Sequence, residues 1–90
     1  MSLFKARVFV HLRPSVLDPA GEATRSATKR LGIEGVTQLR IGKSIELEIE
    51  AETREDARSK ITLMSDRLLA NPVIEDWSLE FKDEQKAFNK

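Results

Sequence analysis

The stretch Lys43–Ala51, with the sequence KSIELEIEA, decides the fold because apolar and polar residues alternate along it from Ser44 onward. Successive side chains of a β-strand point to opposite faces of the sheet, so this alternation predicts a strand with one buried and one charged face. Residues 3–12 alternate in the same way. Pro14 follows them, and we expect the strand to end there because proline cannot donate to the ladder.

A first helix is predicted between these two strands. Asp18 is suited to cap the amino terminus of the helix, and Pro19 is suited to its first position. The helix is expected to run to about Leu31, where Gly32 would close it in a left-handed conformation. Its narrow apolar face, which would allow close packing, consists of Ala20, Ala23, Ala27 and Leu31.

A second helix is predicted after Thr53, which with Asp56 approximates a capping box. Asn71 is expected to adopt a left-handed turn, and Pro72 would prevent continuation of the helix. The spacing of the apolar residues predicts one buried stripe. That stripe consists of Ala57, Ile61, Met64 and Leu68.

Two more strands complete the pattern. Residues 36–41 are interpreted as a strand joined to 43–51 by a tight turn at Gly42-Lys43, or alternatively as part of one long strand with a bulge at Gly42. A last strand is predicted over residues 73–81. The resulting βαββαβ order predicts an α+β fold related to the ferredoxin-like arrangement, with strand order 4-1-3-2 and both helices on one face of an antiparallel sheet. We expect residues 1–82 to form one domain and 83–90 a charged tail.

The outer face of this sheet is predicted to carry complementary charges. Lys5, Arg7 and His11 on the first strand would face the glutamates of 43–51 on one side and the acidic residues of 73–81 on the other. Phe9 lies among these charges. It is interpreted either as a contact residue or as an ordinary surface aromatic.

The composition argues against several kinds of chemistry. The chain has 15 basic and 15 acidic residues, one histidine and no cysteine. We therefore predict no catalytic residue, no metal site, no bound cofactor, no nucleic-acid partner and no membrane partner. RNA-recognition domains share the predicted order, but here glutamates would occupy the face on which such domains stack bases. The absence of cysteine fits a cytoplasmic protein.

Two segments place apolar residues where a solvent-exposed loop is expected. Residues 12–21 read LRPSVLDPAG, and residues 68–75 read LLANPVIE. Val16, Leu17, Leu69 and Ile74 fall off the predicted core stripes. They are candidates for contact with another chain, with a cluster at the edge of the core as the alternative.

These segments resemble the PurS family, small subunits of phosphoribosylformylglycinamidine (FGAM) synthase. The family pattern Leu-Lys/Arg-Pro-x-Val-Leu-Asp-Pro-x-Gly matches residues 12–21, and its Leu-Leu-Ala-Asn-Pro-Val-Ile-Glu signature is present at 68–75. Leu31-Gly32 and the block from Arg40 to Leu47 also match, so the resemblance covers residues 4–81. Trp77 departs mildly from the pattern, which usually has another aromatic such as tyrosine there.

The resemblance implies an oligomeric, non-catalytic subunit of a purine-biosynthetic complex. Such subunits form dimers or tetramers and bridge a PurL-type synthetase subunit and a PurQ-type glutaminase subunit, supporting ammonia transfer. The alternative is a small-molecule sensor of the ACT type, which shares the topology. Asp18, Gly42, Lys43 and Asn71 are predicted to shape turns at contact surfaces. The full set of predicted interface or motif residues is Phe9, Pro14, Val16, Leu17, Asp18, Pro19, Gly21, Arg40, Gly42, Lys43, Leu69, Asn71, Pro72, Val73 and Ile74.

Overall fold

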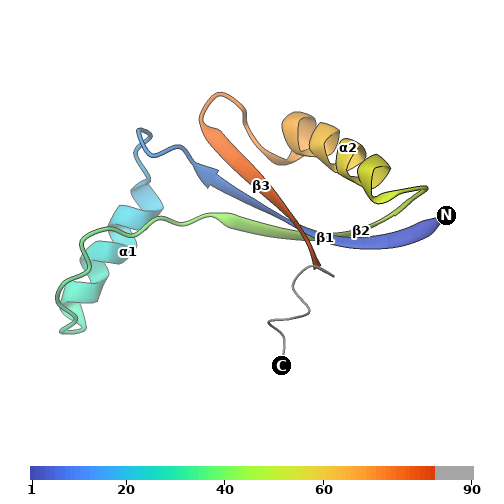
Figure 1. Cartoon of the computed structure of the whole chain (residues 1–90). Coiled ribbons are helices and arrows are strands. Elements are labelled where there is room, and N and C mark those ends of the chain that lie inside the picture. The colour runs from blue at the N-terminus through green and yellow to red at the C-terminus, as the bar shows by residue number, and fades with distance from the viewer. Residues whose placement is uncertain (83–90) are drawn as a thin grey trace.

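The computed structural model describes residues 1–82, which form a three-stranded antiparallel sheet and two α-helices (Figure 1). The sheet order is β2-β1-β3, so β1 is the central strand. This confirms the α+β class and the prediction that the first strand lies between the last two. The elements are β1 (Ser2–Leu12), α1 (Pro19–Arg30), β2 (Lys43–Ala51), α2 (Arg54–Met64), a π-helical turn η1 (Ser65–Leu69) and β3 (Glu75–Phe81).

The predicted strand over residues 36–41 is wrong, because within residues 1–82 this segment pairs with no strand. A hairpin needs at least about two loop residues, and β2 begins directly after Gly42. The chain instead runs past Gly42 into β2 without reversing (Figure 1). A Cβ at Gly42 would lie 2.7 Å from the Val10 carbonyl oxygen, so this glycine permits close approach to β1 instead of forming a hairpin turn or a bulge.

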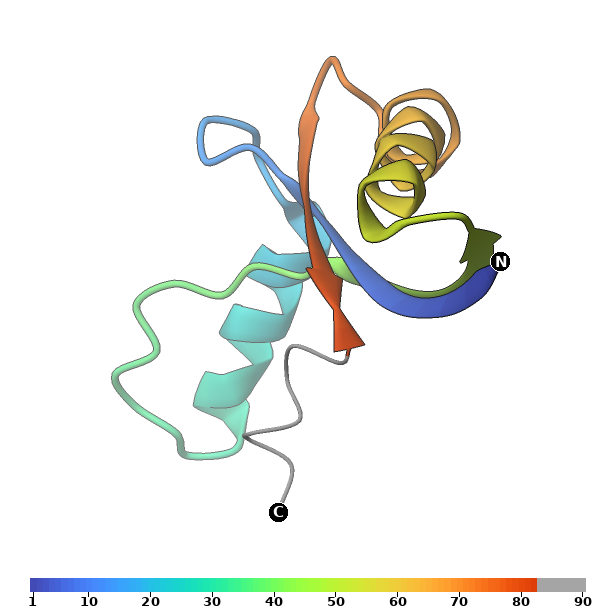
Figure 2. The same cartoon turned by 45° about the vertical axis from the view of Figure 1, so that its right-hand side comes forward.

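Of the two α-helices within residues 1–82, only α2 covers the sheet, and the prediction of both helices on one face is therefore wrong. Figures 1 and 2 show α1 beyond one end of the sheet, while α2 lies across the face. The only buried residue of α1 is Gly21, and Leu31 at its end is 76% exposed. The alanines of α1 offer little apolar area for packing, so the helix gains little from lying on its own sheet. We call residues 18–42, which leave and rejoin the sheet here, the arm.

The core lies between the inner face of the sheet and α2. Ile61 and Phe81 are its largest fully buried side chains, and the ring of Phe81 packs edge-on against Phe4 with centroids 6.2 Å apart. The guanidinium groups of Arg54 and Arg58 also lie over the Phe81 ring, at 4.5 and 5.3 Å from its centroid. The buried apolar residues are Ala6, Val8, Val10, Ala51, Ala57, Ile61, Ala70 and Phe81.

The predicted apolar stripe of α2 changes at η1. Ala57 and Ile61 are buried as predicted, and Ser65, four residues further along the same face, is buried as well, but Leu68 is 77% exposed. The Ala70 amide donates to the Ser65 carbonyl, which is the i to i+5 bond of a π-helical turn. This wider turn rotates the following residues relative to an α-helix, and Leu68 therefore leaves the buried face.

The outer face of the sheet carries the predicted cross-strand charge pairs. Arg7 pairs with Glu46 at 3.0 Å and Lys5 with Glu48 at 3.9 Å. The strand register also places His11 opposite Asp76. The hydrogen bond from Arg7, with the charge of Lys82 as a further cause, holds the pKa of Glu46 below its ordinary value. The prediction that basic β1 residues face acidic neighbours is confirmed.

Candidate interaction surface

The two unusual segments of the sequence meet at one end of the sheet. Because β1 and β3 are antiparallel neighbours, Leu12 pairs with Glu75 and the residues beyond them are brought together. The Arg13 amide donates to the Ile74 carbonyl at 2.9 Å, which extends the ladder past the end of β1. We call residues 13–18 and 70–76 together the corner.

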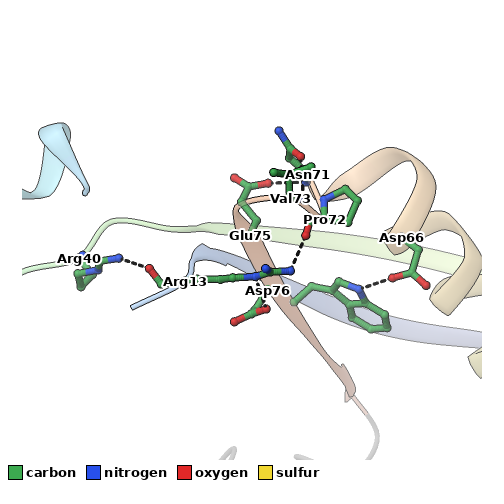
Figure 3. A network of polar contacts seen from close by, with 9 residues as sticks. Arg13, Arg40, Asp66, Asn71, Pro72, Val73, Glu75 and Asp76 are labelled. Atoms are coloured by element: carbon green, nitrogen blue, oxygen red, sulfur yellow. Dashed lines mark hydrogen bonds and ion pairs between the residues drawn. The ribbon is translucent and has the colours of Figure 1, made fainter. Parts of the chain in front are cut away.

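Arg13 ties the two halves of the corner together through its side chain (Figure 3). Its Nε donates to Asp76 Oδ1 at 3.2 Å, and its Nη2 donates to the Pro72 carbonyl oxygen. A planar guanidinium presents several donors in a fixed geometry, so one side chain can hold a carboxylate and a carbonyl at once. The position of the 70–76 turn therefore depends on a residue of the other segment.

Asn71 shapes the turn through its side chain and not through a left-handed backbone. No residue other than glycine has a positive φ within residues 1–82, so the predicted left-handed turn is wrong. The Val73 backbone amide donates to the side-chain Oδ1 of Asn71 at 3.1 Å, and the Asn71 backbone amide donates to Glu75 Oε1 at 2.7 Å (Figure 3). This side-chain turn leaves Val73 outside β3, which begins at Glu75 and not at residue 73.

Arg40 joins the arm to the corner. Its Nη2 donates to the carbonyl oxygens of Arg13 and Val16, at 2.8 and 2.9 Å. Figure 3 shows Arg40 directed toward Arg13, whose guanidinium extends on to the 70–76 turn. The arm, the 13–18 loop and the 70–76 turn are therefore connected in series by two arginines.

Asp18 closes the base of the arm. It caps α1 as predicted, accepting from the Gly21 amide at 3.0 Å, and its other oxygen accepts from the Ile41 amide at 2.8 Å. These backbone hydrogen bonds, led by that of Ile41, hold the pKa of Asp18 below its ordinary value of 3.8. A Cβ at Gly21 would lie only 2.4 Å from the Leu39 carbonyl oxygen. The crossing of the first turn of α1 and the segment at Leu39 therefore needs glycine.

The predicted interface residues are distributed unevenly around these contacts. Leu17 and Val73 are 72% and 75% exposed, and Ile74 is 36% exposed. Leu69 instead packs against the core, as the core-edge alternative proposed. Phe9 is half-buried on the outer face, with the Arg7 guanidinium 5.9 Å from its ring centroid. The remaining predicted residues are half-buried Val16 and exposed Pro14, Pro19 and Lys43.

Two carboxylates of this region make contacts that were not predicted from the sequence, although Asp76 was among the acidic residues of 73–81 expected to face the first strand. Asp76 is the partner of Arg13, and Asp66 Oδ1 accepts from the indole Nε1 of Trp77 at 2.8 Å. The first could have been found once β1 and β3 were paired, since Arg13 and Asp76 are diagonal neighbours in that register. The second depends on η1, which no sequence signal announced.

The arrangement is suited to binding a protein surface. Among residues 1–82, no cluster of three or more histidine, aspartate or glutamate side chains could hold a metal ion. A hollow on the outer face is lined by Lys5, Glu46, Glu48 and Lys82, whose charges are already paired with one another, and by Leu47. In the same residues, neither helix combines the length and apolar character that crossing a bilayer requires. The exposed apolar residues of the corner and the arm thus form the main surface left for contact with another protein.

Comparison with known proteins gives consistent relatives. The family model PurS, described as phosphoribosylformylglycinamidine (FGAM) synthase, matches residues 5–83. A PurS subunit of that synthase from Synechocystis is 51% identical over 77 residues, covering 86% of this chain and 77% of the relative. The structure of Bacillus subtilis PurS is 42% identical with a TM-score of 0.79, covering 87% of this chain and 96% of that one. A chain of the Thermotoga maritima PurLQS structure is 39% identical with a TM-score of 0.81, covering 90% and 99%.

Proposed function

This chain belongs to the PurS family of FGAM synthase subunits, and on that premise we propose that it is the non-catalytic bridging subunit of such a complex. The reaction would convert formylglycinamide ribonucleotide, ATP and glutamine into FGAM, ADP, phosphate and glutamate in de novo purine biosynthesis. The observation that carries the proposal is the similarity, over nearly all of both chains, to a component of a solved PurLQS assembly. The ACT-type alternative receives no support from these relatives.

The proposed partners are a PurL-type synthetase subunit and a PurQ-type glutaminase subunit. In this division of labour the synthetase holds ATP and the glutaminase releases ammonia. This chain would hold the two in register for ammonia transfer, in the cytoplasm. The corner and the arm supply exposed apolar residues for such contacts, among them Leu17, Ile33 and Val73.

A second copy of this chain is the other proposed partner. The inner face of the sheet has one helix where the topology predicts two, and Ile45, Leu47 and Ile49 of β2 remain partly exposed there. The arm meanwhile holds Leu31 and Ile33 in solvent, 76% and 47% exposed. Two copies could cover both surfaces at once, since burying apolar area is the main driving force for association. A closed dimer is the simplest such assembly.

Reconstitution tests the bridging role directly. The synthetase and glutaminase subunits of one organism are mixed with and without its copy of this chain, and FGAM formation is measured with glutamine as the nitrogen donor. We expect glutamine-dependent turnover to require the chain, because ammonia must pass between two proteins that it holds together. Turnover with added ammonium salt is the control and should persist without it. Full glutamine-dependent turnover in its absence would contradict the proposal.

A further inference from the structure

The edge of β2 that faces away from β1 is unpaired within residues 1–82. β2 is an outer strand of the β2-β1-β3 sheet, so only one of its two edges has a partner. Its nine residues include neither proline nor glycine, and a long regular edge of this kind is a template for pairing with another strand. The direction of the backbone groups along this edge determines what could pair with it.

The register of the sheet shows which β2 residues direct their backbone to this edge. In an antiparallel sheet the N–H and C=O of one residue point to the same neighbouring strand, and successive residues alternate. The Arg13 amide donates to the Ile74 carbonyl in the β1–β3 register, so odd-numbered residues of β1 face β3 and even-numbered residues face β2. Val10 pairs with Lys43, and odd-numbered residues of β2 therefore face β1. The backbone groups that point away from the sheet belong to Ser44, Glu46, Glu48 and Glu50.

The segment before β2 continues the same edge. The chain enters β2 without reversing (Figure 1), and residues 37–42 form no backbone–backbone hydrogen bond within residues 1–82. The Ile41 amide donates to Asp18, and the Leu39 carbonyl lies against Gly21, both at the base of the arm. The backbone groups of the even-numbered residues therefore point the other way, as they do in β2. We call this continuous edge of residues 38–50 the free edge.

The free edge is complementary to itself when two copies pair antiparallel about a two-fold axis at Ser44. Apolar residues then lie opposite apolar residues, with Leu47 against Ile41 and Ile49 against Leu39 of the second copy. Opposite charges also meet, because Glu48 lies against Arg40 of the second copy. The hydrogen bonds of Arg40 within residues 1–82 both come from Nη2, so its other guanidinium donors remain for that carboxylate.

The neighbouring positions of the axis fit less well. An axis at Lys43 would place two lysines directly opposite each other, which is unfavourable. An axis at Gly42 would place Ile41 against Lys43 and Leu47 against Thr37, so apolar residues would no longer meet one another. The axis at Ser44 is therefore the register that the sequence of the free edge favours.

We propose that two copies of this chain pair along the free edge in this register, so that residues 38–43 of each copy become the fourth strand of the other copy's sheet. The inference rests on the association of two copies in the proposed function and specifies its strands, register and axis. The βαββαβ order predicts a fourth strand beside β2, and one copy supplies only three within residues 1–82. The pairing also brings the arm of each copy beside the other copy's β2, where Leu31 and Ile33 could cover apolar residues.

Single-cysteine variants test the axis, because the chain has no cysteine of its own. Ser44→Cys places two thiols opposite each other at a hydrogen-bonded pair, with Cα atoms about 5.5 Å apart, a separation suited to a disulfide. In Lys43→Cys the thiols would be diagonal neighbours with Cα atoms about 7–8 Å apart. Under mild oxidation Ser44→Cys should therefore form a covalent dimer at least about ten-fold faster than Lys43→Cys, as measured on non-reducing gels.

A mixture of two variants tests the same register far from the axis. Gln38 of one copy lies opposite Glu50 of the other, whereas each lies about 40 Å from its own counterpart. Neither Gln38→Cys nor Glu50→Cys should crosslink alone, but an equimolar mixture that has exchanged subunits before oxidation should. Sedimentation equilibrium of the wild type and thermal unfolding of each reduced variant are recorded in parallel.

The outcomes separate this pairing from the bridging role. Support requires a wild type of two or four chains, fast crosslinking of Ser44→Cys, and crosslinking of the mixed pair. A monomeric wild type would overturn the pairing, and so would a Ser44→Cys variant that crosslinks no faster than Glu50→Cys, since the copies would then meet elsewhere. Faster crosslinking of Lys43→Cys would overturn the register. The bridging role is decided independently by reconstitution with the other two subunits, and its failure would leave the crosslinking results standing.

Discussion

The molecule has two regions, the sheet covered by α2 and the arm, and they differ in how far their apolar residues are buried. In the first region Val8, Ile61 and Phe81 are fully buried. In the arm only Asp18 and Gly21 are buried, and Leu31 and Ile33 remain in solvent. The arm is held instead by polar contacts at its base, chiefly those of Asp18 and Arg40. The first region therefore has a core of its own, while the arm is held by hydrogen bonds at its base and leaves its apolar residues for the association proposed above.

The largest difference in stability between the two regions is expected for Ile61→Ala, in the core, and Leu31→Ala, in the arm. Truncating a fully buried isoleucine leaves a cavity, so Ile61→Ala should lower the free energy of unfolding by about 2–5 kcal/mol. Leu31→Ala removes an exposed side chain and should change that energy by no more than about 0.5 kcal/mol. Urea denaturation at low protein concentration measures both. Sedimentation equilibrium should then show weaker self-association for Leu31→Ala, and similar unfolding energies for the two variants would break the distinction.

A smaller but specific effect is expected at the base of the arm. In an exposed helix alanine is normally more stabilising than glycine. At position 21, however, the new Cβ of Gly21→Ala would collide with the Leu39 carbonyl oxygen and the Asp18 carboxylate. The crossing must open, and we expect a loss of about 1–3 kcal/mol in unfolding free energy. Ser26→Ala, at an exposed position of the same helix, is the matched control and should be nearly neutral. A Gly21→Ala variant as stable as the wild type would show that the crossing yields easily.

The smallest expected effect is the response of the arm to acid. The folded-state pKa of Asp18 lies below its ordinary value, so its contribution to stability is complete above pH 3.8 and is lost as the pH falls through the folded-state pKa. Protonation weakens the acceptor for the Ile41 amide. The NMR shift of the Ile41 amide proton should therefore titrate with a midpoint below 3.8, and Asp18→Asn should abolish that titration. A midpoint at or above 3.8 would contradict the role given to Asp18.

Local periodicity predicted the elements that the core stabilises. The alternation of 43–51, the cap at Asp18 and the charge pairs of β1 all follow from side-chain direction and hydrogen bonding within short segments. The family resemblance supplied the identity of the two motif segments. The structure then showed that they meet, because the partners of Arg13 lie some sixty residues away.

The errors have three different physical causes. The strand over 36–41 and the placement of α1 on the sheet both assumed that one copy of the chain would satisfy its own apolar residues. The prediction for Leu68 assumed an unbroken 3.6-residue period, which η1 interrupts. The left-handed Asn71 assumed backbone adaptation where a side-chain hydrogen bond suffices. Contacts outside the single chain and a local change of helical pitch are not encoded in short-range periodicity.

The double hydrogen bond of Asp18 has a consequence for how the arm could act. By joining the start of α1 to Ile41, 23 residues later, one carboxylate closes the whole excursion into a loop with its ends fixed. Closing such a loop has an entropic cost that grows only slowly with the length of the loop. This cost arises when the chain folds, before the chain binds another subunit. The base of the arm would then already be fixed relative to the sheet when the chain meets a partner. The binding free energy could go into contacts instead of into ordering the chain.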